Sequence, residues 1–178
     1  MVLIYILIGA GIGLTLLRMV MLIMVRINIK MFNQMVIKLI NAGNTDRAIK
    51  LCNAATRSAY AEATKKMLEQ AQEMGTGVKE MGATKRLLDA FNDDLDARFA
   101  KLHKSDWLAS LGVLLAVAGA ALSLGAEDAP LLPLLGPVVA LGLTFRTRSF
   151  LKKELLVGRE AGTAVAEAYV EAAKTRAA

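Results

Sequence analysis

The chain has 178 residues, of which 55% are hydrophobic, and its formal net charge is +6. A single cysteine and a single histidine exclude a disulfide framework and a metal site made of several Cys and His side chains. Basic residues are mixed with acidic ones through the middle of the chain, which favours solvated helix faces over a nucleic-acid surface.

The N-terminal segment predicts a first transmembrane helix within residues 1–27, running from about Val2 to Val25, in which residues 1–17 carry no charged side chain. A helix of this length measures about 36 Å, more than the roughly 30 Å of a bilayer core. Gly9 and Gly13 form a small-xxx-small pair, which predicts close packing of another helix, although simple tolerance of glycine in lipid explains them equally well. The segment lacks a basic start and a small-x-small cleavage site, so we expect a retained span with its N-terminus outside.

Three basic residues follow the uncharged run. Arg18, Arg26 and Lys30 recur at spacings of eight and four residues, which places them near one helical face. We expect them to contact anionic lipid of the inner leaflet, with Arg18 extending along the helix to reach the headgroups. A role for Arg18 in an ion pathway is the alternative.

Residues 28–105 predict a cytoplasmic helical region. The sequence Ala42-Gly43-Asn44 predicts a helix stop, after which Asn44 or Thr45 caps the next helix. Cys52 lies in that next helix as a packing residue. Glycines between Gly75 and Gly82 predict a turn, and a long helix with an apolar residue every three or four positions resumes near Thr84.

Residues 106–146 predict a transmembrane hairpin with spans at Trp107–Gly125 and Pro130–Phe145. The link between the spans carries Glu127 and Asp128, whereas basic residues lie on both other sides, so the positive-inside rule places the link outside. Residues 147–178 predict a cytoplasmic amphipathic C-terminal helix. The expected fold class is therefore an all-α integral membrane protein with three transmembrane helices, a cytoplasmic helical block and a cytoplasmic C-terminal helix.

Three short segments match, in chain order, the motifs of one known family. The segment Ile40–Leu51 has a Gly-Asn turn followed by an Ala-x-x-Leu helix, Gly112–Ala120 is similar to GLLGTVxGM, and Ala140–Leu143 is similar to TAxGL. With the layout of spans, they resemble the MotA/TolQ/ExbB proton-channel family. The resemblance implies a subunit of a motor or stator driven by the proton-motive force in the bacterial inner membrane. It also implies a homopentamer around a single-pass partner similar to ExbD, TolR or MotB.

The resemblance further implies that small and hydroxyl residues of the hairpin line an ion pathway or face the partner. The threonine of the family's GLLGTV motif falls at Ala116, and that of TAxGL near Val138 or Val139, so neither position has a hydroxyl. The candidate residues are Ser110, Gly112, Ala116, Gly119, Ser123, Gly142 and Thr144.

No Asp, Glu or His lies inside the three predicted spans, yet a proton relay in a membrane needs a titratable group. A motor subunit of this kind would take the carboxylate from its partner. The same composition fits a non-conducting membrane scaffold that keeps the ring, which is the alternative. We expect no enzyme, metal or cofactor, because the sequence lacks a phosphate-binding loop and a nucleophile–His–acid set.

Overall fold

The computed structural model describes residues 2–24, 26–80, 82–104, 106–124 and 134–176, and in this part of the chain every regular element is a helix. The all-α prediction is confirmed to that extent. The chain divides into two compact units. We call Met1–Met24 with Lys101–Lys152 the apolar unit, and Val25–Ala100 with Lys153–Ala178 the bundle unit.

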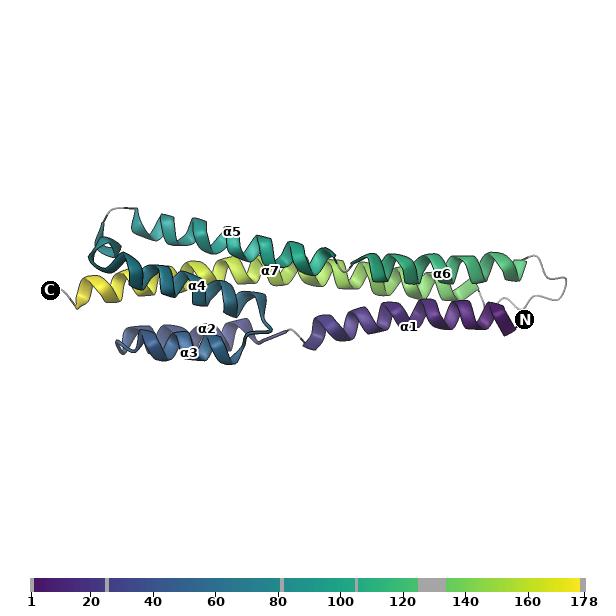
Figure 1. The fold of residues 1–178 in the computed structure, drawn as a ribbon, viewed down its shortest axis with the longest axis horizontal. Helices are drawn as coiled ribbons and strands as arrows, with labels where there is room; N and C mark the ends of the chain where they lie inside the picture. Colours follow the sequence, from purple (N-terminus) through teal and green to yellow (C-terminus); the bar gives the residue numbers. More distant parts are fainter. Residues whose placement is uncertain (1, 25, 81, 105, 125–133, 177–178) are drawn as a thin grey trace. The chain divides into compact units, whose positions relative to one another are not determined.

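The apolar unit is built on two helices, α1 (Val2–Met24) and α6 (Asp106–Leu124), which lie side by side (Figure 1). The N-terminal part of α7 (Leu135–Thr175) completes it. Buried positions on α1 recur every three or four residues, as in the seam of a helix pair. They are Ile4, Ile8, Gly11, Thr15, Arg18 and Leu22.

The outer sides of α1 and α6 are apolar and exposed. Two stretches, Val2–Asn41 and Ala83–Leu124, are long and apolar enough to cross a membrane by length and composition. The predicted third span starts at Pro130, in residues 125–133 that lie outside the described chain. Its described remainder opens α7, which continues to Thr175, so the predicted tail from residue 147 onward is not a separate helix.

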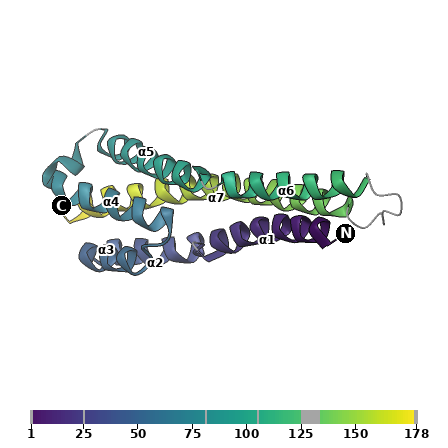
Figure 2. The ribbon, with the colours of Figure 1, turned by 45° about the vertical axis from the view of Figure 1, so that its right-hand side comes forward.

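The bundle unit begins with α2 (Ile29–Asn41), α3 (Thr45–Ala54) and α4 (Ala59–Met74), followed by the short 3-10 helix η1 (Gly75–Lys79). Figure 2 shows α2 beside α3. The first span does not run into α2, because Asn28 caps a new helix by accepting a hydrogen bond from the Met31 amide at 3.2 Å. Gly43 has φ 80°, a left-handed conformation that suits glycine and ends α2 as predicted. Asn44 occupies the N-cap position of α3 without a capping hydrogen bond from its side chain.

The core of the bundle unit centres on Tyr60, whose exposed fraction is 2%. Its ring meets Phe32 of α2 and Phe91 of α5 (Ala83–Lys104) edge to face, with centroids 6.0 and 5.9 Å apart. Its hydroxyl donates a hydrogen bond to Asn33 Oδ1 at 2.9 Å. Gly162 of α7 lies against the Phe91 ring, so both sequence segments of the bundle unit contribute to one aromatic core.

Candidate functional site

A charged cluster lies at the first turn of α6. The guanidinium of Arg18, on α1, donates through Nη2 to Asp106 Oδ1 at 3.1 Å and also to the Leu102 carbonyl. Arg18 is only 2% exposed. The ion pair therefore ties the two apolar helices together across 88 positions of sequence.

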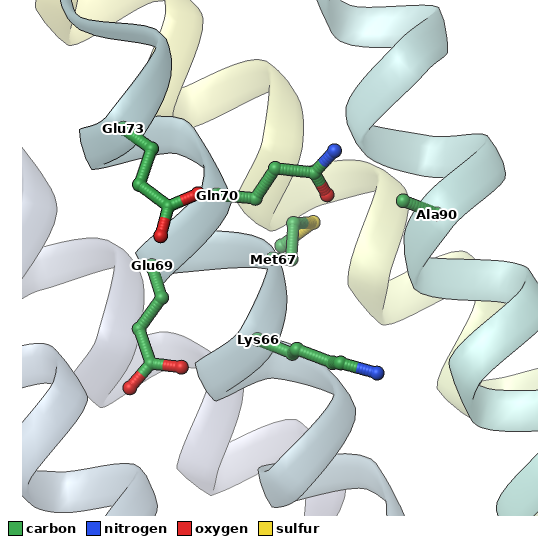
Figure 3. Close-up of a pocket in the computed structure, with 6 residues that line it drawn as sticks. All are labelled: Lys66, Met67, Glu69, Gln70, Glu73 and Ala90. Atoms are coloured by element: carbon green, nitrogen blue, oxygen red, sulfur yellow. The ribbon is translucent and has the colours of Figure 1, made fainter.

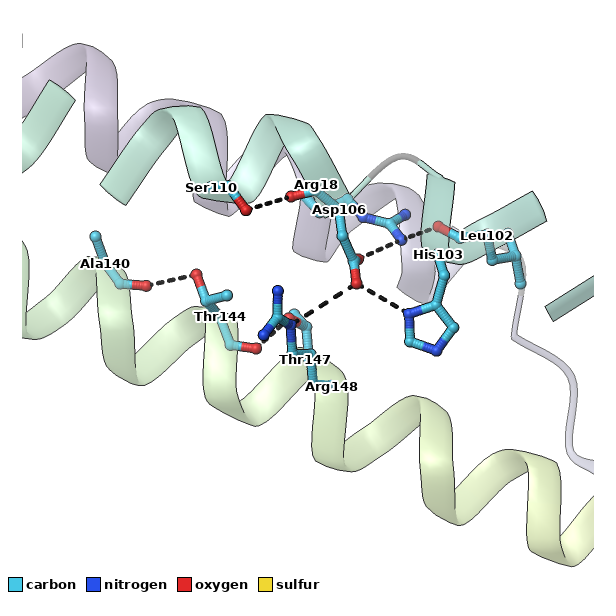
Figure 4. A network of polar contacts seen from close by, with 9 residues as sticks. All are labelled: Arg18, Leu102, His103, Asp106, Ser110, Ala140, Thr144, Thr147 and Arg148. Carbon is cyan, nitrogen blue, oxygen red and sulfur yellow. Dashed lines mark hydrogen bonds and ion pairs between the residues drawn. The ribbon is translucent and has the colours of Figure 1, made fainter. Parts of the chain in front are cut away.

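Asp106 has two further neighbours on its second oxygen, a histidine and an arginine (Figure 4). His103 Nδ1 lies 2.9 Å and Arg148 Nε 3.8 Å from Asp106 Oδ2. His103 and Arg148 are about half exposed, unlike Arg18. One carboxylate thus faces two guanidinium groups, and the cluster keeps an excess of positive charge.

The structure corrects the expectation that Arg18 reaches the lipid headgroups. An arginine buried in an apolar helix needs a counterion and hydrogen-bond acceptors, because desolvation of an unpaired charge is expensive. Asp106 and the Leu102 carbonyl supply these on the inner side of α1, so the side chain turns inward. Its Nε finds no hydrogen-bond partner in the described part of the chain.

The two apolar helices cross most closely at Gly11 and Gly112. A Cβ built on Gly11 would lie 2.5 Å from the Gly112 carbonyl oxygen, and one on Gly112 would lie 2.6 Å from the Gly11 carbonyl oxygen. No side chain fits at such distances. Gly9 and Gly13, predicted to pack a helix, are exposed, and their Cβ positions meet nothing within 4 Å. The close contact thus lies at Gly11, on the other side of α1.

Four of the predicted pathway residues are buried in the apolar unit. Gly112 and Ala116 meet Gly11, and Gly119 meets the Ile4 carbonyl and the Ile8 side chain of α1. Ser123 is buried and donates to the Ala120 carbonyl at 2.6 Å. The chain's own first helix therefore covers the glycine and alanine face of α6.

The remaining three predicted residues lie apart from that face. Ser110 is exposed and donates to the Asp106 carbonyl at 3.2 Å. Thr144, on α7, donates to the Ala140 carbonyl at 2.8 Å. Gly142 is exposed, and its Cβ position meets nothing within 4 Å. The structure does not bring the seven residues together into one lining.

The predicted basic stripe is divided between the two units. Arg26 is 58% exposed, and its Nε lies 3.4 Å from Glu154 Oε1. Burial raises the pKa of Glu154, and the charge of Arg26 opposes that shift. Lys30 is exposed on α2, while Arg18 is enclosed in the apolar unit.

The bundle unit also carries an open depression of about 520 Å³ between α4 and α5. Figure 3 shows Lys66 and Gln70 extending toward α5, which contributes Ala90. Lys66 Nζ lies 2.7 Å from Asp94 Oδ1 of α5, so its charge is already paired. Among the described residues no group of three or more His, Cys, Asp or Glu could hold a metal ion.

Comparison with protein-family models, curated proteins and solved structures finds no match to this chain. The residue that sequence reasoning missed is Asp106, which was placed next to the second span and given no role. The sequence does contain a signal for it. A single arginine inside an apolar span needs an acidic partner, and Asp106 stands directly before the second predicted span.

Proposed function

We propose that the chain is a multi-pass membrane protein whose apolar unit lies in the bilayer. We further propose that it is the non-titrating subunit of a motor or stator complex of the MotA/TolQ/ExbB type. The observation that carries the membrane placement is the outer surface of α1, where large apolar side chains are exposed in both the first and the last turns of the helix, with exposed Gly9, Ala10 and Gly13 between them. The large apolar side chains are Val2, Leu3, Tyr5, Ile6, Leu16, Leu17, Val20, Met21, Ile23 and Met24.

Water is a poor solvent for such a surface. Removing a large apolar side chain from water stabilises a protein by about 1.5–3 kcal/mol, and soluble monomers rarely expose apolar patches beyond a few hundred Å². The one charged side chain of α1, Arg18, is turned inward and paired with Asp106. The outer side of α1 therefore presents no charge to the surrounding medium, which is what lipid requires.

The proposed topology has three spans, with the N-terminus and the link around Glu127 outside, and with residues 28–105 and the C-terminal segment in the cytoplasm. Its support is the distribution of basic residues, together with the antiparallel packing of α1 on α6. In that packing Gly11 meets Gly112 whereas Ile4 and Ile8 meet Gly119, so the two helices run in opposite directions.

A proton-driven mechanism needs a titratable group in the membrane. Within α1 and α6 the ionisable side chains that could carry charge near neutral pH are Arg18 and Asp106, and these hold each other at 3.1 Å. The carboxylate that loads and releases protons therefore belongs to a single-pass partner enclosed by a homopentamer of this chain. The pentamer and the partner follow from the family resemblance.

The non-conducting scaffold is the second candidate, and the hydroxyl groups favour it. Ser110, Ser123 and Thr144 each donate to a backbone carbonyl of their own helix. Ala116, at the position of the family's threonine, is fully buried and lies against Gly11 of α1. A scaffold would keep the ring and its partner while moving no protons.

Purification of the full chain from its native membrane in detergent, followed by native mass spectrometry and cryo-electron microscopy, tests the assignment. The expected result is a homopentamer carrying a single-pass protein with an acidic residue near the start of its helix. A stable monomer without such a protein contradicts it. Proton flux in liposomes holding both proteins separates the candidates, since uncoupler-sensitive flux supports the motor and its absence supports the scaffold.

A further inference from the structure

The helix α2 has one face that the bundle unit leaves open. Its inward face is apolar and buried, through Ile29, Phe32, Val36 and Ile40. At 100° per residue the exposed positions fall on a single arc of about 140° on the other side. These positions are Lys30, Met31, Gln34, Met35, Lys38 and Asn41.

The open face combines apolar and basic side chains. Met31 and Met35 are 55% and 45% exposed, and Lys30 and Lys38 lie next to them on one side of the arc. The helix contains no Asp or Glu. An apolar strip bordered by lysines, with no acidic residue, is complementary to a surface that is apolar inside and negatively charged outside.

We propose that this face of α2 rests on the anionic surface of the same bilayer that α1 enters, which makes α2 an interfacial helix. The proposal builds on the membrane placement proposed above. Residues 25–28 join α1 to α2, and the five Cα–Cα steps from Met24 to Ile29 span at most about 18 Å. The start of α2 is therefore confined to the vicinity of the headgroups, whatever the orientation of the bundle unit.

The side chains suit that location. The two methionines enter the boundary between headgroups and acyl chains, while the lysine stems lie along it with their ammonium groups in the headgroup layer. Each lysine near an anionic surface favours the bound state about fivefold. A second copy docked through the same face of α2 would set Lys30 and Lys38 against the same lysines, so like-charge repulsion disfavours that contact.

Site-directed spin labelling of the full chain in lipid nanodiscs tests the proposal, with Cys52→Ala removing the native thiol. A nitroxide at Met35→Cys reports the open face of α2, and one at Val20→Cys reports the outer side of α1. A nitroxide at Lys50→Cys, an exposed position of α3, serves as the aqueous control. Collision with oxygen, which concentrates in lipid, is compared with collision with a water-soluble nickel chelate.

The expected result is that oxygen dominates at the Val20 and Met35 labels and the nickel chelate at the Lys50 label, in discs of phosphatidylcholine with phosphatidylglycerol. A Met35 label that behaves like the Lys50 label, with the Val20 label in lipid, overturns the interfacial helix alone. A Val20 label in water overturns the membrane placement as well. A Met35 label that neither oxygen nor the nickel chelate reaches is covered by protein, such as a neighbouring copy, and this result also overturns the proposal.

The lysines are tested by the paired change Lys30→Gln with Lys38→Gln. The ratio of lipid-bound to free α2 is expected to fall by about fivefold per lysine, and only in discs that contain phosphatidylglycerol. The matched control removes two exposed lysines elsewhere in the bundle unit, Lys50→Gln with Lys85→Gln, and leaves the Met35 label unchanged. Equal responses of the two pairs overturn the anionic surface as the partner.

Discussion

Arg18 and Asp106 form an ion pair, 3.1 Å from Nη2 to Oδ1, in which Arg18 is buried and Asp106 partly buried. The two helices that carry them are otherwise apolar along their length. The pair is asymmetric in its surroundings. Arg18 is buried and is paired with the carboxylate of Asp106, whereas Asp106 also contacts His103 and Arg148. The loss of one partner therefore differs in consequence from the loss of the other.

Asp106→Asn is expected to lower the free energy of unfolding by about 3–5 kcal/mol, because it leaves the buried Arg18 charge without a counterion. Arg18→Gln is expected to lower it less, since Asp106 keeps the Arg148 guanidinium and the His103 ring as neighbours. Unfolding by SDS in mixed micelles measures both. Arg148→Gln, at a half-exposed position, is the control and changes stability by less than about 1 kcal/mol. An equal loss for Asp106→Asn and Arg148→Gln would contradict the role given to the buried pair.

Gly11→Ala and Gly112→Ala are each expected to separate α1 from α6, because a methyl group at either position overlaps the carbonyl oxygen of the other glycine. Overpacking of this kind costs about 1–3 kcal/mol. Gly9→Ala and Gly13→Ala add the same methyl group to the same helix where nothing lies within 4 Å, and they serve as matched controls. The measurement is again SDS unfolding. Destabilisation by Gly13→Ala equal to that by Gly11→Ala would place the crossing elsewhere.

The sequence predicts a close helix contact at Gly9 and Gly13, whereas the structure has it at Gly11. Because α1 is apolar on all sides, its own pattern does not indicate which face turns inward. In an amphipathic helix the spacing of apolar residues does indicate the inward face. The predicted helix end at Gly43 and the predicted apolar spacing of α5 therefore agree with the structure. The partner of Arg18 lies 88 positions away and depends on how two helices pair, which no local pattern encodes. The continuous α7 was missed because a membrane boundary was expected at Arg146, although nothing there ends a helix.

Gly162→Ala is expected to destabilise the bundle unit, because its Cβ would overlap the Phe91 ring. That ring cannot easily move, since it packs edge to face on the buried Tyr60. Gly158→Ala is the control, because its Cβ would make ordinary contacts at 3.4 Å with Tyr60 and 3.5 Å with Leu95. We expect a loss of about 1–3 kcal/mol for the first change and less than 1 kcal/mol for the second. Limited proteolysis of the full chain in detergent measures the difference, and equal cleavage rates would contradict it.

Cys52 provides a pH-dependent test of the bundle unit. Burial raises the pKa of its thiol from 9.0 to about 12, so the folded protein keeps the thiol neutral where an unfolded chain ionises it. Because the folded state then binds the extra proton, the free energy of unfolding is expected to fall as the pH rises from 9 toward 12. Cys52→Ala removes this component, so its stability should decline less over the same range.

The same burial protects the thiol from reagents, because the thiolate is the nucleophile. At pH 8 the folded chain is expected to react with N-ethylmaleimide far more slowly than the SDS-unfolded chain. Lys50→Cys in a Cys52→Ala background supplies an exposed thiol on the same helix, and its reaction rate should be nearly the same in the folded and unfolded states. Rapid labelling of Cys52 in the folded protein, at the rate of the Lys50→Cys thiol, would show that α3 does not pack on the bundle as the structure has it.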